Sequence, residues 1–200
     1  MRDRIISAFS QSGFPPDSDL PRRLWTAPPR GGAYGDLTHA AVLVPLIDHA
    51  TGMSVLLTRR TDDLSDHAGQ IAFPGGRKDS SDLSPEDTAL RETEEEVGIN
   101  RIQIQVIGRL TAHDTRTGYR VVPVIGVVDP PFTLSPEPSE VAHIFEVPLD
   151  FVLDPANHRL ETYKGAKSGR KFRAIPFGEH YIWGLTARVL FELADVLRKS

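Results

Sequence analysis

The chain has 200 residues, of which 40% are hydrophobic and 25% charged, and this fits one globular domain with a sizeable core. Its net charge of -4 argues against a nucleic-acid-binding protein, because phosphate contacts favour a basic surface. The absence of cysteine excludes disulfides, thiolate metal sites and cysteine nucleophiles, and it fits a reducing cytoplasmic compartment.

The N-terminal part is predicted to form a short helix and then an arm. Residues 3–12 have the pattern of an amphipathic helix, whereas residues 13–37 are rich in Pro, Gly and Asp and are typical of an extended segment. The apolar pair near the start is too short for a signal-peptide core, and no apolar run reaches the length of a membrane span. We therefore expect a cytoplasmic protein with no membrane partner.

Apolar runs predict a sheet in the rest of the chain. The predicted strands lie at residues 39–47, 53–60, 69–76, 102–110, 120–128 and 141–149. Residues 158–177 predict a hairpin, and residues 184–199 predict an amphipathic helix whose buried side carries Leu185, Val189, Leu190, Leu193 and Leu197. Strands on both sides of a central helix, followed by this last helix, predict an α/β fold: a layered sandwich with a central mixed sheet.

The central helix is predicted over residues 84–98, in the stretch SPEDTALRETEEEVG. Ser84 is placed to cap its start, Pro85 suits the first helical position, and Asp87 completes a capping-box pattern. Gly98 stands where a left-handed residue ends many helices. The helix is therefore expected to begin and end at defined residues.

One face of this helix is predicted to be acidic. At about 100° per residue, Glu92, Glu95 and Glu96 share a face, and like charges one turn apart repel by a few tenths of a kcal/mol. A bound cation would compensate, and carboxylates suit Mg²⁺ or Mn²⁺. The alternative is a solvated acidic face. The Gly75-Gly76 turn favours the cation, because paired glycines let the backbone approach a ligand closely.

The stretch RETEEEVGI, residues 91–99, resembles the second half of the sequence box of the Nudix hydrolase family. Thr93 stands where that family has a larger apolar residue, and Asp79 and Asp82 stand where glutamates are usual. The resemblance implies a Nudix-type α/β/α sandwich over residues 38–200, preceded by the helix and arm of residues 1–37.

Residues 56–76, LLTRRTDDLSDHAGQIAFPGG, are similar to the signature of the coenzyme A pyrophosphatase branch of that family. The matching positions are Leu56, Leu57, Thr58, Arg60, Gly69, Phe73, Pro74, Gly75 and Gly76. Thr61 and Ser65 depart from the signature, and Ser65 replaces an expected arginine. Further likeness at residues 117–126, 139–149 and 182–190 extends the resemblance over most of residues 40–195.

The resemblance implies Mg²⁺- or Mn²⁺-dependent hydrolysis of the diphosphate of coenzyme A or its derivatives, giving 3′,5′-ADP and 4′-phosphopantetheine. It implies Glu92 and Glu96 as principal metal ligands, Glu95 as third ligand or base, and the Gly76 carbonyl as a further ligand. Arg91 is expected to position the glutamates. Two other functions stay open: a Nudix enzyme for another nucleoside diphosphate derivative such as ADP-ribose, and a non-catalytic Nudix-fold binding module.

The sequence offers several candidates for the general base and for the residues that contact substrate. Glu140 and Glu137, in the loop of residues 129–140, are candidates for the base, and His67 and His113 are alternatives. The residues expected to bind substrate are Arg59, Arg60, Gly69, Gln70, Phe73, Gly75 and Tyr119, with the basic stretch 163–173 and Phe132 as further candidates. The resemblance also implies a possible homodimer.

Overall fold

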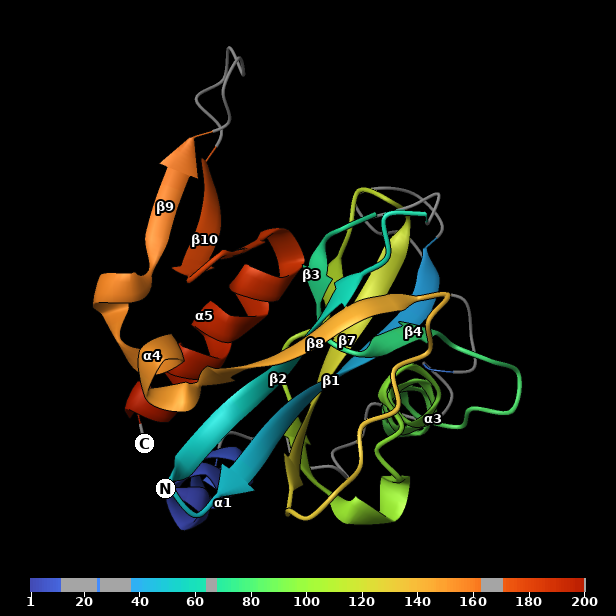
Figure 1. Ribbon diagram of the computed structural model, residues 1–200, viewed down its shortest axis with the longest axis horizontal. Helices are drawn as coiled ribbons and strands as arrows, with labels where there is room; N and C mark the ends of the chain where they lie inside the picture. The colour runs from blue at the N-terminus through green and yellow to red at the C-terminus, as the bar shows by residue number, and fades with distance from the viewer. Residues whose placement is uncertain (12–24, 26–36, 64–67, 163–170, 200) are drawn as a thin grey trace.

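The computed structural model describes residues 1–11, 25, 37–63, 68–162 and 171–199, and its centre is an eight-stranded sheet (Figure 1). The strands of this sheet are β1 (Thr38–His49), β2 (Gly52–Arg60), β3 (Ile71–Ala72), β4 (Gly75–Arg77), β5 (Ile104–Arg109), β6 (His113–Asp114), β7 (Tyr119–Val128) and β8 (Val141–Pro148). A second, three-stranded sheet contains β9 (Arg159–Thr162), β10 (Lys171–Phe177) and β11 (His180–Trp183). Each strand that the sequence predicts is therefore present, although residues 69–76 form two short strands.

The large sheet is mixed, as predicted. Its strands run in the order β3-β2-β1-β7-β5, with β4 paired to β1, β6 to β7 and β8 to β2. The central pair, β1 and β7, is parallel over ten residue pairs, and every other described pair in this sheet is antiparallel. A parallel pair needs a long crossover, and the central helix lies on that connection.

Helices cover both faces of the sheet. They are α1 (Arg2–Gln11), α3 (Pro85–Val97), α4 (Leu149–Leu153) and α5 (Gly184–Lys199), with short 3-10 turns at Arg101–Gln103 and Pro155–Asn157. Figure 1 shows α3 on one side of the sheet and α4 and α5 on the other. The α/β sandwich architecture is confirmed.

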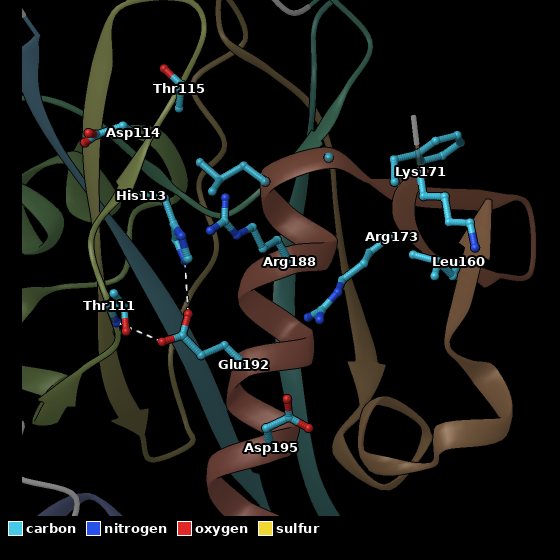
Figure 2. Close-up of a pocket in the computed structure, with 13 residues that line it drawn as sticks. Thr111, His113, Asp114, Thr115, Leu160, Lys171, Arg173, Arg188, Glu192 and Asp195 are labelled. Carbon is cyan, nitrogen blue, oxygen red and sulfur yellow. Dashed lines mark hydrogen bonds and ion pairs between the residues drawn. The ribbon is translucent and has the colours of Figure 1, made fainter. Parts of the chain in front are cut away.

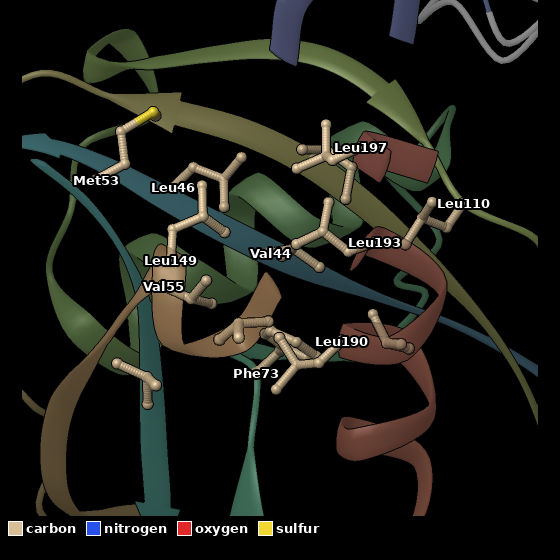
Figure 3. Packing of buried hydrophobic residues seen from close by; sticks show 14 of the residues in the cluster. Val44, Leu46, Met53, Val55, Phe73, Leu110, Leu149, Leu190, Leu193 and Leu197 are labelled. Carbon is tan, nitrogen blue, oxygen red and sulfur yellow. The ribbon is translucent and has the colours of Figure 1, made fainter. Parts of the chain in front are cut away.

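Strand β1 supplies side chains to both layers, because successive residues of a strand point to opposite faces. Val44 and Leu46 pack with Leu190 and Leu193 of α5, as Figure 3 shows. Leu43, by contrast, packs in a second core with residues of α3. These two cores hold the acidic helix and the C-terminal helix on opposite sides of one strand.

The N-terminal helix is part of the first core. Ile5 and Phe9 of α1 are fully buried there, and α1 packs against β5 and α5. Most of the predicted arm (residues 13–37), Ser65, His67 and the tip of the predicted hairpin (residues 163–170) lie outside the described residues. Within the described part of the chain, no helix is long and apolar enough to cross a membrane.

Candidate functional site

Helix α3 is fixed at both ends by the groups that the sequence predicts. The Ser84 hydroxyl accepts a hydrogen bond from the Asp87 N–H, which satisfies a donor of the first turn. Gly98 ends the helix with a φ of 80°, in the left-handed region. The loop of residues 129–140 then donates to the last turn, from the Ser135 N–H to the Val97 carbonyl and from the Glu137 N–H to the Glu96 carbonyl.

Glu96 is the most buried carboxylate of α3, with 3% of its surface exposed. Its Oε2 accepts a hydrogen bond of 3.0 Å from the Gly75 N–H, and its Oε1 lies 3.5 Å from Nη1 of Arg60. Burial raises the pKa of Glu96 to about 8, against the opposing effects of the Gly75 N–H and Arg60. The charges of Glu140 and Glu92 raise this pKa further.

The turn at Gly75 and Gly76 requires glycine at Gly75 and leaves little room for a side chain at Gly76. Strand β4 pairs with β1 so that Gly75 lies opposite Val42 and Gly76 opposite Ala41. A Cβ on Gly75, whose φ is +153°, would lie 2.4 Å from the Ala41 carbonyl oxygen. A Cβ on Gly76 would lie 2.5 Å from the carboxyl carbon of Glu92. The turn therefore brings backbone directly against the acidic face of α3.

Arg91 connects the acidic face to the loop before the helix. Its Nη1 lies 2.9 Å from Glu92 Oε1 and 2.9 Å from Glu95 Oε2, and its Nη2 donates to the Arg77 carbonyl at 3.0 Å. Its Nε and Nη2 bind the two oxygens of Asp82 at 3.2 and 3.0 Å. Arg91 therefore contacts both Glu92 and Glu95, and its positioning role stays a prediction.

Asp82 stands where the Nudix box has a glutamate, and the structure places it on Arg91 rather than in the acidic face. It is 4% exposed and also accepts a hydrogen bond of 2.8 Å from the Thr88 hydroxyl. Burial acts to raise the pKa of Asp82, but the hydrogen bonds from Arg91, the Asp79 N–H and Thr88 outweigh it and hold the pKa below its ordinary value. No pattern in the sequence predicted this contact.

The carboxylate cluster, which we define as Glu92, Glu95, Glu96 and Glu140, fits a divalent cation by charge and donor type. Burial raises the pKa of Glu92 despite Arg91, and the charges of Glu95 and Glu140 add to the effect. Hard carboxylate oxygens close together are the donors that Mg²⁺ and Mn²⁺ prefer. Among the described residues, however, no three acidic or histidine side chains already form an ion site, and Arg60 and Arg91 contact the glutamates.

The two loop candidates for a base differ in their surroundings. Glu140 is partly buried and its charge acts on both Glu92 and Glu96. Its carbonyl accepts from the Thr61 N–H, just after β2. Glu137 is fully exposed, and hydrogen bonds from the Ser139 side chain and N–H lower its pKa. Of the two, only Glu140 belongs with the acidic face.

The two arginines predicted to bind substrate have different partners. Nη1 of Arg60 lies 3.5 Å from Oε1 of Glu96, whereas Nη2 of Arg59 lies 3.3 Å from Oδ2 of Asp62. The backbones of Gly69 and Gln70 pair with the end of β2, through the Gly69 N–H to the Thr61 carbonyl and the Arg60 N–H to the Gln70 carbonyl. This pairing holds the chain beside Arg60.

The three aromatic candidates lie in different surroundings. Phe73 is 4% exposed and packs in the core with α5, so its side chain supports the turn from behind. Tyr119 is partly exposed, and the Arg77 guanidinium lies 5.3 Å from its ring centroid. Arg77 is an exposed cation beside the box that the sequence reasoning missed, although it directly follows Gly76. Phe132 packs partly buried in the core on the α3 side.

His113, an alternative acid–base candidate, does not reach the carboxylate cluster. Its Nε2 lies 3.0 Å from Oε2 of Glu192 on α5, and its side chain is 4% exposed. It therefore belongs to the layer opposite α3.

A family model for the NUDIX domain matches residues 37–164 of the chain. A protein of Yersinia enterocolitica described as an uncharacterized Nudix hydrolase NudL is 37% identical over 196 residues, which cover 98% of each chain. A protein of the same description from Photorhabdus laumondii is 42% identical over 174 residues, covering 86% of this chain and 92% of that one.

Two solved structures share the fold. The structure of a MutT/nudix family protein from Enterococcus faecalis gives a TM-score of 0.56 at 16% identity, covering 100% of this chain and 75% of that one. The structure of the MutT protein from Methanosarcina mazei Go1 gives a TM-score of 0.51 at 19% identity, covering 82% and 98%.

Proposed function

Because the chain belongs to the Nudix hydrolase family, we propose that it hydrolyses the diphosphate linkage of coenzyme A or a coenzyme A derivative. The products would be 3′,5′-ADP and 4′-phosphopantetheine or its acyl form. The observation that carries the proposal is the contact of the buried Glu96, on the acidic face of α3, with the Gly75 turn. The likeness of residues 56–76 to the coenzyme A branch signature supports this choice of substrate.

The metal ligands in this proposal are Glu92 and Glu96, with Glu95 and the Gly76 carbonyl as further donors. A bound Mg²⁺ or Mn²⁺ supplies charge that neutralises diphosphate oxygens and lowers the pKa of the attacking water. Arg91 orients the glutamates through its contacts with Glu92 and Glu95. These assignments follow the resemblance of residues 91–99 to the Nudix box.

The remaining side chains of the site are proposed to accept a proton and to contact the substrate. Glu140 accepts the proton of the attacking water, since it is the loop carboxylate whose charge acts on Glu92 and Glu96. Arg60 and Arg77 contact phosphate oxygens: the Arg60 guanidinium lies 3.5 Å from Glu96, and Arg77 is an exposed cation that directly follows Gly76. Tyr119, stacked under Arg77, offers a ring face to the substrate.

A substrate panel tests the proposed function. We expect purified protein with Mg²⁺ to hydrolyse coenzyme A or an acyl-coenzyme A faster than ADP-ribose, measured as kcat/KM from product release. Faster turnover of ADP-ribose would contradict the coenzyme A proposal and identify a diphosphatase for ADP-ribose or a similar compound. Ser65, which stands where the coenzyme A signature has an arginine, favours this alternative. Saturable binding of these compounds without hydrolysis would instead identify a binding module.

The assignment of the base is tested by a matched pair of loop variants. We expect Glu140→Gln to lower kcat by roughly a hundredfold or more, because a positioned general base contributes about that much. Glu137→Gln should stay close to the parent, since Glu137 is exposed and bonded to Ser139. Equal losses in the two variants, or a larger loss for Glu137→Gln, would remove Glu140 from this role.

A further inference from the structure

A pocket lies on the face of the sheet opposite the carboxylate cluster. This α5 pocket has a volume of about 650 Å³ and is formed by residues of β6, β10 and α5 together with their flanking loops (Figure 2). Helix α5 packs in the core of Val44 and Leu46, whereas α3 packs in the core of Leu43. The α5 pocket is therefore separate from the proposed hydrolytic site.

The acidic side chains of the α5 pocket already have partners. Asp114 accepts hydrogen bonds of 2.7 and 2.8 Å from Arg120, and Asp195 is bonded to Arg198. Glu192 accepts from the Thr111 N–H at 3.0 Å and lies 3.0 Å from the buried His113. The charges of Asp114 and Asp195 are thus compensated by arginines, and Glu192 has hydrogen-bonding partners inside the protein.

The basic side chains of the pocket, by contrast, have no acidic partner among the described residues. The side chains of Arg188 in α5 and Lys171 in β10 have no hydrogen-bond or ion-pair partner among the described residues. Arg173 contacts the ring of Phe191, with its guanidinium 4.7 Å from the ring centroid, and has no acidic partner in the described part of the chain. Figure 2 shows Arg188 extending from α5 toward the strand of His113, while Arg173 and Lys171 come from the β10 side. The pocket therefore has an excess of uncompensated positive charge.

The start of α5 adds to this charge. Gly184 and Leu185, its first two residues, line the pocket, and the N-terminal end of a helix carries partial positive charge. Leu160 and Phe172 give the same pocket apolar surface. Planar guanidinium groups match phosphate geometry, and a pocket of this volume has room for more than one phosphate.

We propose that the α5 pocket binds a phosphate-bearing small molecule, with Arg188 and Arg173 as the principal contacts. The source of the phosphoryl group is either free inorganic phosphate or an organic phosphate whose apolar part contacts Leu160 and Phe172. The net charge of -4 disfavours a nucleic acid as the occupant. Because the site lies on the opposite face of the sheet, this inference does not depend on the hydrolytic activity.

Calorimetric titration of the full chain in metal-free buffer tests the proposal, with inorganic phosphate and phenyl phosphate as probes. We expect saturable binding of at least one probe, weakened about tenfold or more in Arg188→Gln and further in Arg188→Gln/Arg173→Gln. Tighter binding of phenyl phosphate would indicate an organic ligand, and equal binding would indicate the free ion.

The matched control is Arg101→Gln, which removes an exposed arginine near α3 and should bind the probes like the parent. Thermal melts check that each variant is folded, and the exposed positions of Arg188 and Arg173 make folding defects small. The proposal is overturned if neither probe binds at millimolar concentration, or if the double variant binds as tightly as the parent.

Discussion

The Glu96→Gln variant is expected to lose roughly a hundredfold or more of kcat while keeping its fold, because it loses a proposed metal ligand. Glutamine keeps an oxygen that can accept the Gly75 N–H, so the hydrogen bond of 3.0 Å has a replacement. It cannot, however, supply a negative charge to a cation. Steady-state hydrolysis with Mg²⁺, together with a thermal melt, measures both parts of this expectation.

Glu94→Gln is the matched control for that variant. Glu94 lies on the same helix but is exposed, and its Oε1 accepts only from the Asn100 side chain in the described structure. We expect parent-like kcat from this variant, so a general effect of removing charge from α3 is separated from loss of the ligand. Parent-like hydrolysis by Glu96→Gln would show that the metal assignment is wrong.

The Arg91→Gln variant is expected to be destabilised by about 2–3 kcal/mol and to lose activity as well. Removing one partner of a buried ion pair typically costs 3–5 kcal/mol, and the lower estimate reflects the 25% exposure of the Arg91 side chain. The variant leaves Asp82, which is 4% exposed, without its cation. Denaturant unfolding measures the loss in the free energy of unfolding.

The pH dependence of this loss has a defined sign. Since the pKa of Asp82 is lowered in the folded protein, the pair stabilises the fold above the ordinary carboxyl range, and this contribution disappears as the pH falls through the lowered pKa. The difference between parent and Arg91→Gln should therefore be full at neutral pH and shrink in strong acid.

The control for Arg91 is again Arg101→Gln. The pair of Arg101 with Asp87 spans 3.9 Å between side chains that are 48% and 40% exposed, so its loss should change stability by less than about 1 kcal/mol. Equal destabilisation in the two variants would show that the contacts of Arg91 with Asp82, Glu92 and Glu95 contribute nothing specific.

The sequence predicted the acidic helix well because its determinants are local. Ser84 and Gly98 are the residues that cap α3, and the fold of strands and helices around it follows the predicted order. Helical periodicity also placed Glu92, Glu95 and Glu96 on one face. Periodicity alone did not show that Glu96 is buried while Glu95 is exposed, since this depends on Gly75, which β4 brings to the helix through its pairing with β1.

Two features of the site depend on contacts between residues that the sequence pattern alone does not predict. Arg59 and Arg60 were assigned together to the substrate, but Arg59 pairs with Asp62, and of the two only Arg60 reaches Glu96. Asp82 stands where the Nudix box has a glutamate, and its partner, Arg91 on the next helix, could not be read from that position. The assignments of individual residues to substrate or metal remain predictions, which the variants described above test.

The hydrogen bonds between the loop of residues 129–140 and the end of α3 limit how the length of this loop can change. The amides of Ser135 and Glu137 occupy the last carbonyls of the helix, and the same loop continues to Glu140. An insertion or deletion in the loop would therefore fray the final helical turn and shift Glu140 at once. The proposed proton acceptor and the proposed ion ligands are mechanically linked, so neither can be repositioned independently of the other.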